Sequence, residues 1–161
     1  MKFDAVYYEP AIFDYPLGRQ LREEYGDLPW IPIESHNSIR EMQEKPNDQF
    51  GHMKRNLIAG IRKTHKYVEN HKVSDYLVPY TSSGCTAMCL YCYLVCNYNK
   101  CAYLRLFVNR EQMLDRIIKK GKNSGTPLTF EIGSNSDLAD CGIILITASI
   151  PERRVEDRME Y

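Results

Sequence analysis

Cysteine is both abundant and clustered in this sequence. Six cysteines occur in 161 residues, and five of them fall between Cys85 and Cys101. Cys85, Cys89 and Cys92 follow the spacing C-x3-C-x2-C. Cysteine thiolates are soft ligands that suit iron–sulfur clusters or zinc. Three thiolates would leave one iron of a four-iron cluster without a protein ligand, and that iron could bind a substrate or a cofactor.

Three other interpretations of these cysteines stay open. A zinc site prefers four ligands, and Cys89 and Cys92 would then form one pair, with Cys96 and Cys101 as further ligands. Cys89 and Cys92 could instead form a redox disulfide. Some thiols could simply be small buried hydrophobic groups. Clustered thiols in a reducing compartment are more often ligands than disulfides, which favours the metal interpretations.

The segments on either side of the cysteine loop predict the elements that position it. Residues 76–80 predict a strand, and the turn-rich stretch 81–84 follows it. Gly84 allows a sharp turn into the loop. After the loop, residues 103–108 alternate aromatic and branched side chains, which predicts a second extended segment.

A helix is expected directly after this extended segment. Asn109 can cap its first turn with Gln112 as the capping partner, and Gly121 would end it. Its apolar face consists of Met113, Leu114, Ile117 and Ile118. Residues 128–132 predict the next strand. The order strand, loop, helix, strand is typical of a βαβ unit in a parallel sheet.

The N-terminal part of the chain is rich in proline. Residues 1–35 predict short, mostly irregular segments, because four prolines interrupt them. Within this part, residues 6–8 predict a first strand and residues 19–25 a brief helix that ends at Gly26. Residues 57–61 predict another strand.

A basic stretch surrounds the strand predicted at residues 57–61. Its members are Lys54, Arg55, Arg62, Lys63, His65 and Lys66. We interpret this stretch as a solvated face in preference to a phosphate-binding site, because a run of charges is not by itself specific for a ligand.

The composition is that of one soluble globular domain. Hydrophobic residues make up 43% and charged residues 26% of the chain. Lys+Arg and Asp+Glu are equal at 21 each, so no global charge attracts nucleic acid or a membrane surface. The N-terminus lacks the apolar core of a secretory signal, and the longest apolar run, 142–150, is too short to span a bilayer. We therefore expect a cytoplasmic protein without a membrane partner.

The cysteine loop and several segments outside it resemble the spore photoproduct lyase family of the radical S-adenosylmethionine (SAM) superfamily. In that superfamily the motif C-x3-C-x-aromatic-C, here with Tyr91 as the aromatic residue, follows the first strand of a partial (β/α) barrel. The resemblance runs from about Tyr7 to Asp137 and implies an α/β fold, the beginning of such a barrel, preceded by an irregular N-terminal α/β region. The matching segments are Tyr8-Glu9-Pro10, Tyr15-Pro16-Leu17-Gly18, Ser35-His36-Asn37, Gly60-Ile61-Arg62-Lys63-Thr64, Gly84 to Leu94, and Tyr103-Leu104-Arg105 with Val108-Asn109.

The resemblance implies a DNA-repair lyase. Members of the family split the spore photoproduct, 5-thyminyl-5,6-dihydrothymine, back to two thymines. A reduced [4Fe-4S] cluster cleaves SAM to methionine and a 5′-deoxyadenosyl radical, which takes a hydrogen from the lesion. The implied cofactors are this cluster, with Cys85, Cys89 and Cys92 as its ligands, and SAM. The implied partners are DNA that carries the photoproduct and a cellular electron donor, in the cytoplasm of a spore-forming bacterium.

Further site residues are implied by the same resemblance. Tyr91 would lie against the adenine of SAM. Tyr93 matches a tyrosine of the family's hydrogen-transfer relay, although a packed aromatic with a bonded hydroxyl is an equal alternative. Ser136 and Asp137 match a Ser-Asp pair placed to contact SAM at the end of a barrel strand.

The sequence departs from the family at the final hydrogen donor. Many members have a cysteine two residues before the serine of the Ser-Asp pair, and this chain has Ser134 there. A serine O–H bond is too strong for ready hydrogen donation. Cys96, Cys101 and Cys141 are the remaining thiols that could take the role.

Length is the second departure, because family members have more βα units and a C-terminal hairpin that engages DNA. We expect an N-terminal family region at 1–75, the first βαβ part of the barrel with the iron–sulfur loop at 76–138, and a divergent tail at 139–161. One βαβ unit cannot close a barrel, so we expect a truncated form of the lyase. The alternatives are a non-catalytic zinc or iron–sulfur interaction module, and an inactive fragment.

Overall fold

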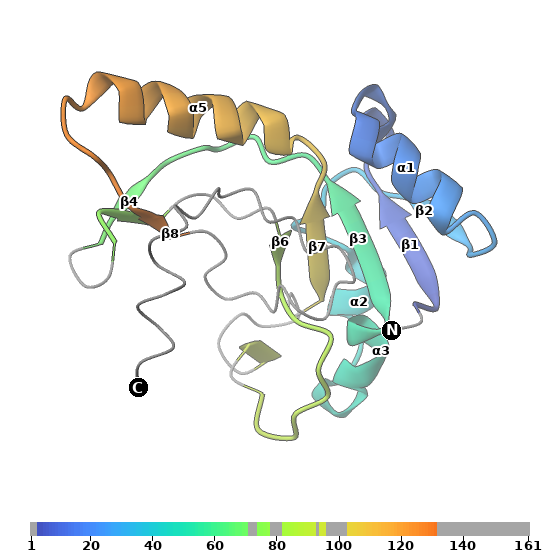
Figure 1. The fold of residues 1–161 in the computed structure, drawn as a ribbon. Coiled ribbons are helices and arrows are strands. Elements are labelled where there is room, and N and C mark those ends of the chain that lie inside the picture. The colour runs from blue at the N-terminus through green and yellow to red at the C-terminus, as the bar shows by residue number, and fades with distance from the viewer. Residues whose placement is uncertain (1–2, 71–73, 78–81, 93, 96–102, 132–161) are drawn as a thin grey trace, which may run out of the picture.

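A five-stranded sheet forms the centre of the computed structural model, which describes residues 3–70, 74–77, 82–92, 94–95 and 103–131 (Figure 1). The strand order is β2-β1-β3-β7-β6. Four of these strands are parallel, and β6 runs antiparallel to β7. The predicted α/β class is therefore confirmed. The strands are β1 (Ala5–Tyr8), β2 (Trp30–Pro32), β3 (Asn56–Gly60), β6 (Ser82–Ser83) and β7 (Leu104–Phe107).

Helices cover both faces of this sheet. On one face, Val6 of β1 and Leu57 of β3 pack with η1 (Pro10–Asp14) and α1 (Pro16–Glu24). On the other, Tyr7 packs with α2 (Arg40–Gln43) and α3 (Phe50–Lys54), which follow each other through η2 (Asn47–Gln49). Alternate strand residues thus face opposite layers, and all of β3 is buried, as expected for a central parallel strand.

A second, three-stranded sheet has the order β4-β5-β8. Its strands are β4 (Val68–Glu69), β5 (Tyr76–Leu77) and β8 (Phe130–Glu131), and α5 (Arg110–Asn123) connects the two sheets (Figure 1). β5 and β8 pair in parallel, which confirms the predicted βαβ unit. The Lys120 ammonium lies 4.2 Å from the centre of the Tyr76 ring and holds α5 against this sheet.

Two strands differ from the sequence prediction. The segment at 103–108 forms β7 as predicted, but it joins the main sheet beside β3 instead of the βαβ unit. Ser82 and Ser83, expected in a turn, pair with β7 as the edge strand β6. Pairing with β7 therefore outweighs the weak strand propensity of serine at these two positions.

The prolines of residues 1–35 are compatible with more regular structure than we expected. Pro16 occupies the first turn of α1, where its missing N–H leaves no hydrogen bond unmade. Pro32 ends β2, which lies at the edge of the sheet. The prolines therefore mark the ends of elements, and β1, α1 and β2 form between them.

The ends of α5 also differ from the prediction. Asn109 precedes the helix, but its side chain makes no capping bond to the helix backbone. Its amide instead donates to the Arg62 carbonyl at 2.9 Å and to Gln112 Oε1 at 3.0 Å. The helix continues past Gly121 to Asn123. None of the helices in the described ranges is long and apolar enough to cross a membrane.

Gly18 provides a test of the packing on the α1 face. A Cβ at this buried position would overlap the backbone carbonyl of Ile12. We therefore expect Gly18→Ala to lower the free energy of unfolding by about 1–3 kcal/mol, measured by urea denaturation. Gly121→Ala in α5 is the matched control, because a Cβ there meets nothing within 4 Å. It should raise stability by up to about 1 kcal/mol, and equal effects of the two changes would contradict the packing described.

Candidate functional site

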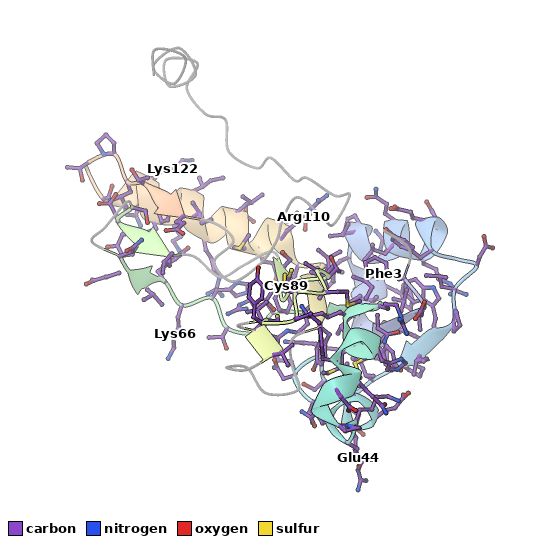
Figure 2. The ribbon with its side chains drawn as sticks, turned by 90° about the horizontal axis from the view of Figure 1, so that it is seen from below. Phe3, Glu44, Lys66, Cys89, Arg110 and Lys122 are labelled. Carbon is purple, nitrogen blue, oxygen red and sulfur yellow. The ribbon has the colours of Figure 1, made fainter. Side chains whose placement is uncertain are left out.

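The cysteine loop leaves the edge strand β6 through a sharp turn. Gly84 adopts a φ of 87°, a conformation that side-chain-bearing residues rarely take. Thr86 is buried, and the Ala87 amide donates to Cys85 Sγ at 3.3 Å. Cys89 lies on the exposed part of the loop (Figure 2). The glycine thus turns the chain so that a short loop carries the motif beside the main sheet.

The three thiols of the motif form no disulfide, and in the described ranges they do not converge on one metal-binding point. Cys85 and Cys92 are partly buried and Cys89 is exposed. In the ranges that the structure describes, no three His, Cys, Asp or Glu side chains are arranged to hold a metal ion. The donor set nevertheless fits an iron–sulfur cluster, because it offers three soft thiols on one short loop that begins at a glycine turn.

A buried lysine supports this loop from α3. Lys54 has no exposed surface, and its ammonium donates to the Cys85 carbonyl at 3.0 Å. Lys54 belongs to the basic stretch interpreted as a solvated face, and for this residue that interpretation is wrong. Its helix turns it inward beside Met53, which is also buried. The solvated interpretation holds for Arg55, which is exposed and pairs with Asp4 at 2.7 Å.

The same lysine acts on the third cysteine of the motif. Burial alone would raise the pKa of the Cys92 thiol, but other interactions outweigh it and hold the pKa below its ordinary value. They are hydrogen bonds from the backbone at Val95 and Leu94, together with the charge and hydrogen bond of Lys54. A thiolate is the form that binds metal, so the surroundings of Cys92 favour ligation.

The described structure covers only part of the implied SAM site. Tyr91, expected against the adenine of SAM, lies on the loop with 89% of its surface exposed. Tyr93, Ser134, Ser136 and Asp137 lie outside the described residues, as do Cys96, Cys101 and Cys141.

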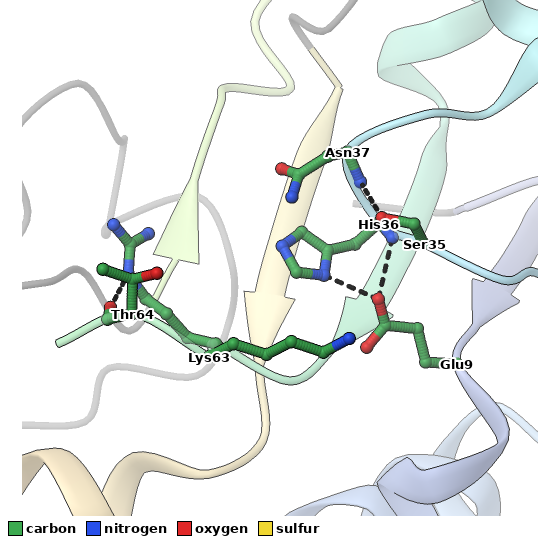
Figure 3. A pocket seen from close by; sticks show the side chains of 7 residues that line it. Glu9, Ser35, His36, Asn37, Lys63 and Thr64 are labelled. Atoms are coloured by element: carbon green, nitrogen blue, oxygen red, sulfur yellow. Dashed lines mark hydrogen bonds and ion pairs between the residues drawn. The ribbon is translucent and has the colours of Figure 1, made fainter.

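A second polar site lies at the carboxyl ends of β1, β2 and β3 (Figure 3). The buried Glu9 carboxylate accepts from the His36 ring at 2.7 Å and from the His36 amide at 2.9 Å through Oε1. Its Oε2 accepts from the Ile61 amide at 2.9 Å. Glu9 therefore ties the loop after β2 to the segment after β3.

A pocket of about 200 Å³ opens over this pair. It is lined by Glu9, Ser35, His36, Asn37, Arg62, Lys63 and Thr64. Gly60 makes the arrangement feasible, because a Cβ there would lie 2.8 Å from the His36 ring. In the sequence these residues stand out only as segments of the family resemblance. The signal that could have located the pocket is that three of the quoted segments each follow a parallel strand.

The Glu9–His36 pair predicts acid sensitivity. Burial lowers the pKa of His36 below its ordinary 6.5, although Glu9 acts to raise it. Burial would raise the pKa of Glu9, but its hydrogen bonds with His36 and Ile61 hold the pKa below 4.5. The unfolded chain therefore binds more protons than the folded chain at acidic pH. We expect the free energy of unfolding to fall as the pH drops below 6.5, and to fall further where Glu9 is protonated below pH 4.5.

Urea denaturation between pH 8 and pH 4 measures this effect. His36→Gln should have a lower free energy of unfolding at neutral pH. That free energy should also fall less steeply than in the unaltered chain as the pH drops below 6.5. His65→Gln measures a separate contribution to this pH dependence, because burial, Arg116 and Arg62 also lower the pKa of His65. A pH slope unchanged in His36→Gln would contradict the assignment of a buried neutral imidazole at residue 36.

Comparison with known proteins identifies the family. The family described as spore photoproduct lyase matches residues 1–156. The spore photoproduct lyase of Bacillus subtilis (strain 168) is 34% identical over 138 residues, which cover 83% of this chain and 40% of the relative. The spore photoproduct lyase of Geobacillus sp. (strain Y412MC61) is 31% identical over 150 residues, 90% of this chain and 43% of the relative. The chain belongs to the spore photoproduct lyase family.

Solved structures agree with this assignment. A spore photoproduct lyase complexed with dinucleoside spore photoproduct superposes with a TM-score of 0.74 and 28% identity, over 84% of this chain and 41% of that chain. A mutant spore photoproduct lyase with bound AdoMet and dinucleoside spore photoproduct gives the same values. The chain therefore spans about two fifths of the length of the relatives that it matches.

Proposed function

We propose that this chain provides the cluster-binding part of a spore photoproduct lyase, a radical SAM enzyme that returns the DNA photoproduct to two thymines. The single observation that carries the proposal is the glycine-turned loop with three free thiols, in a chain that belongs to this family. A relative in the family binds AdoMet and dinucleoside spore photoproduct together, which supports SAM as cofactor and the photoproduct as substrate.

Cys85, Cys89 and Cys92 are the proposed ligands of a [4Fe-4S] cluster. When bound, such a cluster supplies the electron that cleaves SAM, and a cellular electron donor must deliver it. The protein's own part is to fix the loop and to favour the thiolate form of Cys92. Lys54 does both, because its ammonium holds the Cys85 carbonyl and favours the thiolate of Cys92.

The remaining residues of the proposed site either bind SAM or belong to the path of hydrogen transfer. Tyr91 has an exposed ring that is accessible for stacking on an adenine. Ser136 and Asp137 are the proposed polar contacts to SAM, and Tyr93 is the proposed member of the hydrogen relay.

Ser134 replaces the cysteine that many relatives use as the last donor, so another group must donate that hydrogen. The proposed organisation remains residues 1–75 as N-terminal region and 76–138 as the first part of the barrel.

The proposal is tested by SAM cleavage under anaerobic conditions. The reconstituted 161-residue chain is incubated with dithionite, SAM and dinucleoside spore photoproduct, and 5′-deoxyadenosine and thymidine products are quantified by liquid chromatography. We expect slow formation of 5′-deoxyadenosine that needs all three cysteines. Repair of the photoproduct is quantified in the same reaction, because the chain spans only about two fifths of the length of the relatives that it matches.

The controls separate this function from its alternatives. Cys89→Ser leaves the loop polar but removes one thiol, and it should abolish 5′-deoxyadenosine formation. A chain that takes up zinc in place of iron and leaves SAM intact would overturn the proposed function in favour of a zinc-binding interaction module.

A further inference from the structure

The pocket over Glu9 lies at a point where the chain reverses its path through the sheet. From β1 the chain passes through α1 to β2 on one side, whereas β3 lies on the other side of β1, next to β7. α1 covers one face of the sheet, and α2 and α3 cover the other. Neighbouring strands whose connections diverge in this way leave a crevice at their carboxyl ends, and such crevices are where open α/β sheets bind ligands.

The charges around this crevice favour an anion. Arg62 and Lys63 line it, and the Arg105 charge also acts on the His36 ring. Glu9 is the one acidic group among the described lining residues, and both of its oxygens already accept hydrogen bonds from His36 and Ile61. The local charge around the crevice is therefore positive, because three cationic side chains surround one carboxylate whose oxygens already accept hydrogen bonds from the protein.

Arg62 is held in place before any ligand arrives. Its Nε donates to the Thr64 carbonyl at 3.1 Å, and its guanidinium lies 5.3 Å from the centre of the Phe107 ring. Its backbone amide donates to Asn109 Oδ1 at 2.9 Å, and its carbonyl accepts from the same side chain. A guanidinium fixed in this way loses little conformational entropy on binding.

His36 supplies a complementary group at the base of the pocket. Because Nδ1 lies 2.7 Å from the Glu9 carboxylate, it must carry the ring proton, and Nε2 is left as an acceptor. Nε2 makes no hydrogen bond with the part of the chain that the structure describes. The Tyr103 hydroxyl fixes this loop by donating to the His36 carbonyl at 3.2 Å. A ligand whose oxygens carry negative charge matches the cations of the pocket, and a free phosphate or phosphate monoester can also donate its O–H to Nε2.

We propose that this crevice is a binding site for a phosphate group, held by Arg62 and Lys63 with His36 Nε2 at its base. A volume of about 200 Å³ suits one phosphate better than a whole nucleotide, since pockets for larger organic ligands begin at about 300 Å³. Arginine and lysine are the residues that recognise phosphate oxygens. The phosphate can belong to a DNA backbone or to a free nucleotide, and the site does not depend on the cysteine loop or on the proposed reaction.

The test is a phosphate titration of the full 161-residue chain, kept reduced and without a cluster, followed by NMR of the histidine rings. We expect inorganic phosphate to shift the His36 signals and to raise the pKa of His36, because a bound anion favours the imidazolium. The His52 signals should not move. Sodium chloride at matched ionic strength should leave the His36 signals unchanged.

Variants assign the response to the pocket. Arg62→Ala should weaken phosphate binding by about tenfold or more, Arg62→Lys by less, and Lys63→Ala by several-fold. Lys66→Ala is the control, because Lys66 is a nearby exposed cation that does not line the pocket. An absent His36 shift, or one that is equal in Arg62→Ala and in the unaltered chain, would overturn the proposal.

Competition then identifies the source of the phosphate. Thymidylyl-thymidine, which carries a diester, should displace inorganic phosphate if the site holds a DNA backbone. Displacement by thymidine 5′-monophosphate alone would assign the site to a free nucleotide. Both outcomes support a phosphate site, and they remain measurable whether or not the chain binds a cluster or cleaves SAM.

Discussion

Alanine at Cys85, Cys89 or Cys92 is expected to lower the iron content of the anaerobically reconstituted chain from about four atoms to nearly none. A [4Fe-4S] cluster that loses one of its three thiolates has two irons without a protein ligand, and we expect it to dissociate. Iron and acid-labile sulfide are measured per chain after removal of unbound metal. Far-UV circular dichroism should stay unchanged, because the three cysteines are partly buried or exposed and lie outside the helices and strands.

Cys96→Ala and Cys101→Ala are the matched controls for this loss. Both lie close to the motif in sequence, and on the three-ligand interpretation neither should reduce the iron content. If these two changes reduce metal binding as strongly as changes within the motif, the site has four or more thiolates. That result would contradict the interpretation that one iron of the cluster has no protein ligand, and it would favour the zinc alternative.

Lys54→Met is expected to have the second largest effect on the cysteine loop. Methionine keeps an unbranched apolar chain but leaves the Cys85 carbonyl without its partner and removes the charge beside Cys92. The pKa of Cys92 should rise, so alkylation of that thiol by iodoacetamide at neutral pH should slow several-fold. The cluster should also be lost faster on exposure to a chelator.

Stability measurements separate this role from a general folding defect. Leaving the partly buried Cys85 carbonyl unbonded costs at most about 1–3 kcal/mol, and removing the buried charge of Lys54 offsets part of this cost. Arg55→Met is the control, since Arg55 is the next residue but pairs on the surface with Asp4. It should change stability by less than about 1 kcal/mol and leave Cys92 alkylation unaffected. Equal alkylation rates in both variants would contradict the role assigned to Lys54.

Much of the main sheet could be predicted because its strands have simple patterns. The segments at β1 and β3 are short, apolar and bounded by polar or turn-forming residues, so their position follows from the sequence. α5 follows from its apolar face. Its ends do not, because Asn109 bonds to Arg62, which is 47 residues away in sequence, instead of capping the helix. A local rule was therefore overridden by a tertiary contact.

The cysteine motif could be predicted from spacing, but the group that supports it could not. Lys54 lies in a basic stretch, and lysine is almost never fully buried without a partner. Its partner is a carbonyl 31 residues further along the chain, which only the fold brings close. The Glu9–His36 pocket was missed for the same reason, because strand order decides which loops meet at the carboxyl ends of the sheet.

The central claim is that Cys85, Cys89 and Cys92 hold a [4Fe-4S] cluster with one iron open to SAM. Electron paramagnetic resonance of the dithionite-reduced, reconstituted chain tests it most directly. We predict the signal of a reduced [4Fe-4S] cluster, and we predict that SAM changes its shape because SAM binds at the open iron. A chain that contains zinc and gives no such signal, or a cluster signal that SAM leaves unchanged, would contradict the claim.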